Sequence, residues 1–202
     1  MNRGLLLVVS GPSGAGKDDI VEALVKKDNN LVVSVSDTTR PIKEDDIEGK
    51  EYNFITNKEF FKKVDQGLYL EWAEVYGNYY GTLKHKIKRL LDSGKDVIVK
   101  VDIKGALNIK EKIDDAVLIF ILPKSMEELR QSMLEKKSDK DSPDSLLRRF
   151  NSAYAEISSI SKYNYAIVND NNIEDSINKI ENIIKAEKIR VDRIKDELEY
   201  LK

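Results

Sequence analysis

A glycine-rich loop directly after an apolar run is the feature that most constrains how this chain can fold. The run covers residues 5–9 (LLLVV), and the loop reads GPSGAGK over residues 11–17. The spacing G-x-x-x-x-G-K between a buried strand and a helix is typical of a phosphate-binding loop, because backbone N–H groups and the positive end of the helix surround a phosphate. The motif predicts an α/β fold that binds nucleotide phosphates, with Lys17 reaching the β- and γ-phosphates.

The residues after Lys17 depart from this pattern. A Ser or Thr usually follows the lysine, and its hydroxyl binds the magnesium of a nucleoside triphosphate, whereas here Asp18 and Asp19 follow. A carboxylate about 4 Å from a phosphate charge costs roughly 4 kcal/mol at an effective dielectric constant of about 20. A Mg²⁺ ion bound to Asp18 would offset this repulsion, because magnesium accepts carboxylate ligands. Both outcomes stay open, and Asp18 is a candidate metal ligand.

Apolar runs along the chain predict a three-layer fold with a parallel sheet. Five runs are continuous in Val, Ile and Leu, as expected for strands covered on both faces: residues 5–9, 31–35, 96–101, 116–122 and 165–168. Segments with helical spacing lie between them, at residues 17–27, 83–93, 103–112 and 125–137. The last of these opens with Ser125 and Glu128, which form a capping-box pattern. This alternation of strands and helices indicates an α/β domain.

Two stretches interrupt the alternation. Residues 37–82 hold two short strand-like pieces, 52–55 and 68–73, around one helix at 57–66, and residues 135–150 are strongly polar until a helix begins at Leu146. We therefore expect a core in residues 1–36, 83–125 and 151–202, a small mixed insertion in 37–82 and a helical lid in 126–150. Residues 173–202 repeat Ile, Val and Leu at helical spacing and predict one long helix or a helix pair.

Composition narrows the class of protein. The 202 residues include 34 basic and 36 acidic side chains, a balance that gives no electrostatic reason to expect a nucleic-acid or membrane partner. No stretch approaches the roughly 20 apolar residues that span a bilayer. The chain has no cysteine and one histidine, His85, which excludes disulfides and metal sites built from Cys or several His. We expect a globular protein of the cytoplasm.

The insertion carries groups that suit a nucleoside monophosphate. Arg40, Lys43 and nearby tyrosine hydroxyls are suitable donors for a phosphate monoester. A buried glutamate, for which Glu71 is the candidate, accepts two hydrogen bonds from the Watson–Crick edge of guanine, where adenine offers no matching pair of N–H groups.

Seven motifs, in order and at matching spacing, resemble those of guanylate kinases. They are SGPSGAGK, SVSxTTRP, E-G-x-x-Y-x-F, LEWAEVYGNYYGT, V-D-I-x-G-A, ILPxSMEEL and Y-N-Y-A-I-V-N-D. The resemblance covers about residues 3–185. It implies a P-loop core, a GMP-binding insertion and a lid, which together transfer the γ-phosphoryl group of ATP to GMP with Mg²⁺.

Site residues follow from the resemblance position by position. It implies catalytic roles for Lys17, Arg40, Arg148 and Arg149. The ATP phosphates would lie on Gly11, Pro12, Ser13, Gly14, Ala15, Gly16, Lys17, Asp18 and Asp19, and the adenosine end near Asn169. The GMP phosphate would lie on Arg40, Lys43, Tyr52 and Tyr80, and guanine against Ser36, Glu71 and Thr82. Asp102 would lie near GMP and near the water shell of the metal.

The departures from the family pattern lie in this same site. Besides Asp18 and Asp19, Lys43 replaces a second arginine of the phosphate set and loses its bidentate fork. Lys100 replaces one acid of a strand-end pair, and the lid reads Ser132 and Lys136 where arginines are usual. Lys100 and Asp102 lie on the same face of their strand, next to the loop, so we hypothesise that Lys100 pairs with Asp18 or Asp19.

Three functions remain open. The first is a guanylate kinase, a monomer or homodimer, whose activity is weakened or altered by these departures. The second is a catalytically impaired relative that binds GMP or a protein partner without turnover, in keeping with a GMP half that matches the family better than the ATP half. The third, a kinase for another nucleoside monophosphate, is disfavoured by Glu71, because such hydrogen-bonding sites discriminate by about 10⁴.

Overall fold

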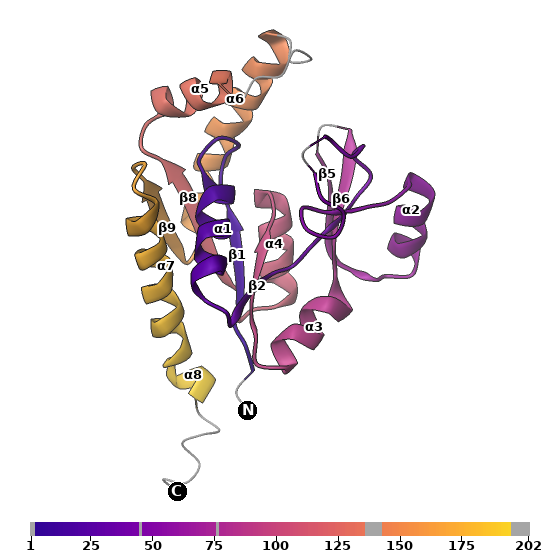
Figure 1. Ribbon diagram of the computed structural model, residues 1–202, viewed down its shortest axis with the longest axis vertical. Helices are drawn as coiled ribbons and strands as arrows, with labels where there is room; N and C mark the ends of the chain where they lie inside the picture. The colour runs from indigo at the N-terminus through magenta and orange to yellow at the C-terminus, as the bar shows by residue number, and fades with distance from the viewer. Residues whose placement is uncertain (1–2, 45, 76, 136–142, 195–202) are drawn as a thin grey trace, which may run out of the picture.

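A parallel five-stranded sheet forms the centre of the computed structural model, which describes residues 3–44, 46–75, 77–135 and 143–194 (Figure 1). Its strand order is β2-β7-β1-β8-β9. The bounds are β1 (Leu6–Ser10), β2 (Leu31–Val33), β7 (Asp96–Lys100), β8 (Val117–Pro123) and β9 (Tyr165–Asn169). All five expected strands are present, which confirms the α/β fold class, although β2 ends two residues before the expected end.

Helices cover both faces of this sheet because its side chains alternate between them. On one face, Leu7 and Val9 of β1 pack with apolar residues of α1 (Lys17–Lys27) and α7 (Ile173–Lys188). On the other, Leu6 and Val8 pack with α3 (Lys84–Asp92) and α4 (Ile103–Lys112). The loop between β1 and α1 therefore leaves the middle of a doubly covered sheet at its carboxyl edge, where ligands bind in folds of this kind.

A second, mixed sheet lies to one side of the core, at the right of Figure 1. Its order is β4-β3-β6-β5, with bounds β3 (Asp37–Thr38), β4 (Asn53–Phe54), β5 (Tyr69–Val75) and β6 (Asn78–Leu83), and it carries α2 (Asn57–Asp65). The buried carboxylate of Asp37 joins these pieces, because it accepts hydrogen bonds from Lys63, Tyr69 and Asn53 at 2.6–2.9 Å. Strand β6 was not among the expected strands.

Two helices, α5 (Met126–Glu135) and α6 (Pro143–Ile157), lie at the top of Figure 1, in the part of the chain where we expect a lid, and we call them the lid helices. The expected start of α6 at Leu146 was wrong, since the helix begins at Pro143, a residue favoured in the first helical turn. The helix also runs past residue 150, where we expected the lid to end. Residues 136–142 lie outside the described part of the chain. They include Lys136, one of the positions where the sequence departs from the arginines usual in the family.

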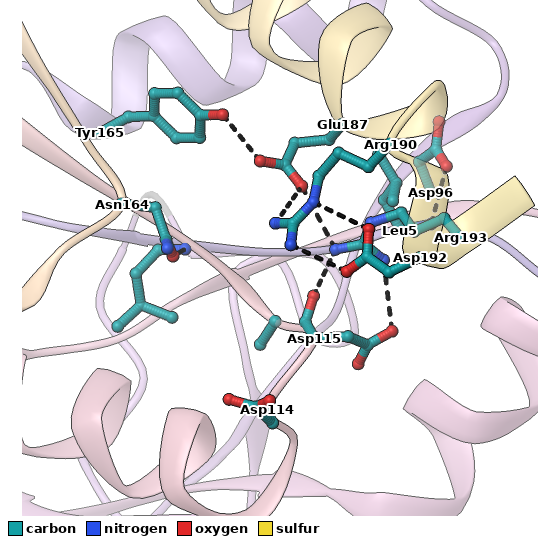
Figure 2. Close-up of polar contacts among 12 residues, drawn as sticks. Leu5, Asp96, Asp114, Asp115, Asn164, Tyr165, Glu187, Arg190, Asp192 and Arg193 are labelled. Atoms are coloured by element: carbon teal, nitrogen blue, oxygen red, sulfur yellow. Dashed lines mark hydrogen bonds and ion pairs between the residues drawn. The ribbon is translucent and has the colours of Figure 1, made fainter.

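The last described residues form a helix pair held by buried charges. Helix α8 (Val191–Ile194) follows α7, and the buried carboxylate of Glu187, in the last turn of α7, contacts Arg193 of α8 (Figure 2). It accepts hydrogen bonds from Tyr165 at 2.7 Å, Arg190 at 3.2 Å and Arg193 at 3.3 Å. Arg193 also contacts Asp115, which precedes β8 in the chain. In the described ranges, no helix is long and apolar enough to cross a membrane.

Candidate active site

The loop between β1 and α1 has the backbone that its glycines predict. Gly14 and Gly16 adopt φ angles of +94° and +79°, in the left-handed region that favours glycine. A Cβ on Gly16 would lie 2.3 Å from the side-chain nitrogen of Asn169, which itself donates a hydrogen bond to the carbonyl of Ala15 at 3.0 Å. Asn169, at the end of β9, therefore packs directly against the loop.

Both lid helices contact this loop. From α5, the Ser132 hydroxyl donates to the Gly14 carbonyl at 3.0 Å, and from α6, the Arg149 guanidinium donates to the Ser13 hydroxyl at 3.1 Å. Its neighbour Arg148 is exposed. The structure thus brings Arg149 to the loop and leaves Arg148 at the surface of the lid.

A cavity opens beside the loop on the α5 side. It is lined by Gly14 to Gly16, Asp19, Lys124 and Glu128, and by Asn169 and Asn171 beyond the end of β9. A hydrogen bond joins two walls of this cavity, because the Asn171 side chain donates to the Glu128 carboxylate at 3.2 Å. Its lining includes Asn169, the residue that the resemblance leads us to expect near the adenosine end of ATP.

The three residues expected around guanine lie together. The Thr82 hydroxyl donates to the Glu71 carboxylate at 2.7 Å and lies 3.2 Å from the Ser36 hydroxyl. Glu71 and Thr82 are buried, at 4% and 0% exposure. Burial raises the pKa of Glu71 to about 7, although the hydrogen bond from Thr82 acts to lower it. Glu71 is thus a buried acceptor close to its protonation midpoint at neutral pH.

The start of α4 adjoins this carboxyl group. Asp102 caps the helix by accepting a hydrogen bond from the Gly105 backbone at 2.7 Å, and its negative charge further raises the pKa of Glu71. A Cβ on Gly105 would lie 2.9 Å from Glu71 Oε2 and 3.1 Å from Asp102 Oδ1. Gly105 therefore leaves the space that these two carboxylates occupy.

The residues expected around the GMP phosphate form a second group. Arg40 makes two hydrogen bonds to Asp46, at 2.8 and 3.0 Å, and its guanidinium lies 5.5 Å from the centre of the Tyr52 ring. The ring of Tyr80 lies 5.4 Å from that of Tyr52. Burial raises the pKa of Tyr52 to about 12, so its hydroxyl stays a donor. Lys43 is exposed, and its backbone amide donates to Asp46 at 2.6 Å.

Asp18, directly after the loop, lies near the residues that we expect around the GMP phosphate. The carboxylate of Asp18 acts on Tyr52, whose pKa it helps to raise after burial and Tyr80. Asp18 also pairs with Lys100, at 2.7 Å between Nζ and Oδ1. The pairing hypothesis is confirmed for Asp18. Its basis is the register of the sheet, in which Lys100 at the end of β7 lies opposite Val9 of β1.

Two residues near the site were not found from the sequence. One is Asp46, which holds Arg40 and whose only signal is its place in an acidic run between the phosphate residues. The other is Glu156 on α6, which accepts a hydrogen bond from Ser152 at 3.2 Å. Burial raises the pKa of Glu156, while the charge of Lys17 lowers it. Its carboxyl group therefore lies within electrostatic reach of the loop lysine, although no motif marks it.

Comparisons with known proteins agree on one family. The model of the family described as guanylate kinase matches residues 3–187. A guanylate kinase of Clostridium perfringens (strain SM101) is 53% identical over 197 residues, 98% of this chain and 90% of that protein. One of Clostridium tetani is 50% identical and covers 98% and 93%. A crystal structure of guanylate kinase from Anaplasma phagocytophilum superimposes with a TM-score of 0.80 at 33% identity, covering 98% of this chain and 95% of that one.

Proposed function

The chain belongs to the guanylate kinase family and is a nucleoside monophosphate kinase, and we propose that it transfers the γ-phosphoryl group of ATP to GMP through the residues described above. The observation that carries the residue assignment is the buried Glu71–Thr82–Ser36 group beside a phosphate loop. A buried carboxylate supported by hydroxyls suits the adjacent N–H groups of guanine. Adenine lacks that pair of donors and would leave the carboxylate unsatisfied.

The acceptor phosphate is proposed to bind Arg40, Tyr52 and Tyr80, with Lys43 as an added charge. Asp46 holds the Arg40 side chain in place without any ligand. The guanidinium has five N–H donors, so some of them remain available to bind the phosphate. Such preorganisation reduces the entropy lost on binding. Arg40 is therefore expected to act without rearrangement, whereas the exposed Lys43 must order its side chain.

The donor is proposed to bind through the loop, Lys17 and Asn169. Phosphoryl transfer needs alignment and neutralisation of charge more than covalent chemistry. Arg149, which contacts the loop at Ser13, and Arg148 are the lid cations that we propose to neutralise the transferring group. A lid that covers the phosphates also keeps water from accepting the phosphoryl group.

Magnesium is proposed to accompany ATP. Mg²⁺ is commonly bound by one or two carboxylates together with substrate phosphates and water, and Asp18 and Asp102 supply carboxylates of that kind. Within the described ranges, no cluster of three or more acidic, His or Cys side chains would hold a metal without the nucleotide. When bound, the ion would neutralise charge on the phosphates of ATP. We expect EDTA to stop turnover.

We also propose that the protein acts in the cytoplasm, where its proposed substrates are found, as a monomer or a homodimer. Light scattering coupled to size-exclusion chromatography distinguishes these two states.

Steady-state turnover tests the proposed function. ADP production from Mg-ATP is measured with GMP, with dGMP and with AMP, and the Asp18→Ser variant is measured beside the parent protein. We expect turnover with GMP, and a rate with AMP lower by about 10⁴ because Glu71 would lose its partners. Equal turnover with AMP would contradict the role of Glu71. GMP binding without turnover in the parent, with recovery in Asp18→Ser, would instead show an impaired relative.

A further inference from the structure

Lys100 and Asp18 are brought together by the fold from 82 positions apart. Lys100 ends β7, and Asp18 lies in the first turn of α1, directly after Lys17. Lys100 Nζ lies 2.7 Å from Asp18 Oδ1, and the side chains of Lys100 and Asp18 are 34% and 70% exposed, respectively. The pair therefore lies at the mouth of the loop, where a bound nucleotide would meet it.

The charge at this place differs from that of a plain phosphate loop. The usual residue after the lysine carries a neutral hydroxyl, so Asp18 adds a negative charge beside the phosphate site. A like charge a few ångström from a polyanion opposes binding, and the repulsion grows as the ligand displaces water. Lys100 places a positive charge against the same carboxylate.

The pair is a poor candidate for a purely structural role. Ion pairs between exposed side chains contribute little to the free energy of folding, typically 0–1 kcal/mol. The same two charges also act on the phosphates of a bound nucleotide, which carry negative charge of their own. Their effect should therefore appear in nucleotide binding and not in the unfolding temperature.

We propose that Lys100 enables nucleotide binding by neutralising Asp18, so that the two residues work as one unit in the phosphate site. This inference rests on the proposed function, because it assumes that the loop binds ATP. Lys100 then acts through Asp18, as a positioning and charge-compensating residue. Removing Lys100 takes its positive charge away from the Asp18 carboxylate beside the phosphate site, and removing both side-chain charges takes the carboxylate away as well.

A double-mutant cycle tests the proposal. ATP binding is measured by isothermal titration calorimetry without GMP and in EDTA, so that neither turnover nor a metal ion contributes. The proteins are the parent, Lys100→Met, Asp18→Asn and the double variant. The control is Lys26→Met, which breaks an exposed pair with Glu22 on the same helix, α1, at 3.0 Å. Thermal unfolding of each protein is recorded as a second measurement.

We expect Lys100→Met to weaken ATP binding by about tenfold or more, and the double variant to bind within about threefold of the parent. Lys26→Met should bind as the parent does, and none of the unfolding temperatures should fall by more than a few degrees. Unchanged binding by Lys100→Met, or a double variant as weak as Lys100→Met, would overturn the proposal. A parent that turns over Mg-ATP with GMP but binds no ATP in EDTA would overturn this inference alone, because the metal ion and not Lys100 would then offset the charge of Asp18. A parent that binds no ATP even with Mg²⁺ would overturn the proposed function.

Discussion

Glu71 shows how burial sets the chemistry of a single residue. Its pKa of about 7 means that the free protein near neutral pH holds this carboxyl partly protonated. The ionised carboxylate offers both oxygens as acceptors to the two guanine N–H groups that we propose it binds, whereas the protonated form uses one oxygen as a donor. On this assignment, GMP binding is coupled to the loss of a proton from a group whose raised pKa results first from desolvation.

This coupling predicts a pH dependence with a definite sign. Below pH 7 the protonated form dominates, so GMP affinity should fall as the pH decreases from 8 to 6, and it should level off above the pKa. Near pH 7 we expect a net release of protons on GMP binding, because the raised pKa keeps Glu71 partly protonated in the free protein. Calorimetry in two buffers of different ionisation enthalpy measures this release. Release that stays near zero at pH 7 would contradict the assignment of Glu71.

Gly105 provides a second test at the residue scale. Gly105→Ala should favour helix α4 by up to about 1 kcal/mol through propensity, yet the new Cβ would meet Glu71 Oε2 at 2.9 Å. Because a carboxylate at the end of a side chain can move, we expect little loss of stability but a rise in KM for GMP of about tenfold. KM for ATP should not change. The matched control is Asn108→Ala on the same helix, and an equal rise there would contradict the explanation.

The sequence predicts the contacts of some site residues and not of others. The pairing of Lys100 with Asp18 follows from strand alternation and from the adjacency of two strands, and both are readable in the chain. Asp46 and Glu156 are not predictable in this way. Asp46 lies in an exposed-looking acidic run, and Glu156 reaches the site only through the direction in which α6 crosses the core.

At the scale of elements, periodicity predicts the core better than the insertion. Helix α4 matches its expected bounds, Ile103–Lys112, because its apolar spacing and its Asp102 cap agree. Strand β6 was missed because Asn78–Leu83 (NYYGTL) lacks the Val and Ile content of a strand and is formed by antiparallel pairing with β5. The start of α6 was misplaced because its first turn follows a polar segment without periodicity.

The lid offers a prediction at this scale. Arg149 on α6 contacts Ser13 of the loop, so Arg149→Ala removes a cation that we propose to act on the phosphates. Loss of such a cation costs about 10²-fold or more in kcat, while KM for GMP should change little. Arg130, an exposed arginine of α5, supplies the control, Arg130→Ala. An equal loss of kcat in the control, or an unchanged kcat for Arg149→Ala, would contradict a role for Arg149 in catalysis.

The contacts between Glu187 and helix α8 predict that a substitution there lowers the stability of the protein and leaves catalysis unchanged. Glu187→Ala leaves Tyr165 and the largely buried Arg193 without their shared acceptor (Figure 2). Breaking a buried charge network typically costs about 3–5 kcal/mol. We expect a loss near the lower end in urea unfolding, with KM values unchanged. Glu174→Ala, which breaks an exposed pair with Lys27, should cost less than about 1 kcal/mol.

Across the whole molecule, three parts of the chain meet at the carboxyl edge of the sheet. The core supplies the loop and Lys100, and the mixed sheet supplies most of the side chains that we propose for guanine and the acceptor phosphate. Helices α5 and α6 supply Ser132 and Arg149 (Figure 1). Each part alone holds only a portion of the proposed site. Transfer between two nucleotides requires all three, and it requires that water be kept from the transferring group.

Transfer of label from ATP to GMP tests this arrangement most directly. The protein is incubated with ATP labelled at the γ-phosphate, GMP and Mg²⁺, and the products are separated. We predict that the label appears in GDP, with little in inorganic phosphate, and that omission of GMP leaves it in ATP. Label that remains in ATP, or that passes to inorganic phosphate instead of GDP, would contradict phosphoryl transfer to GMP at this site.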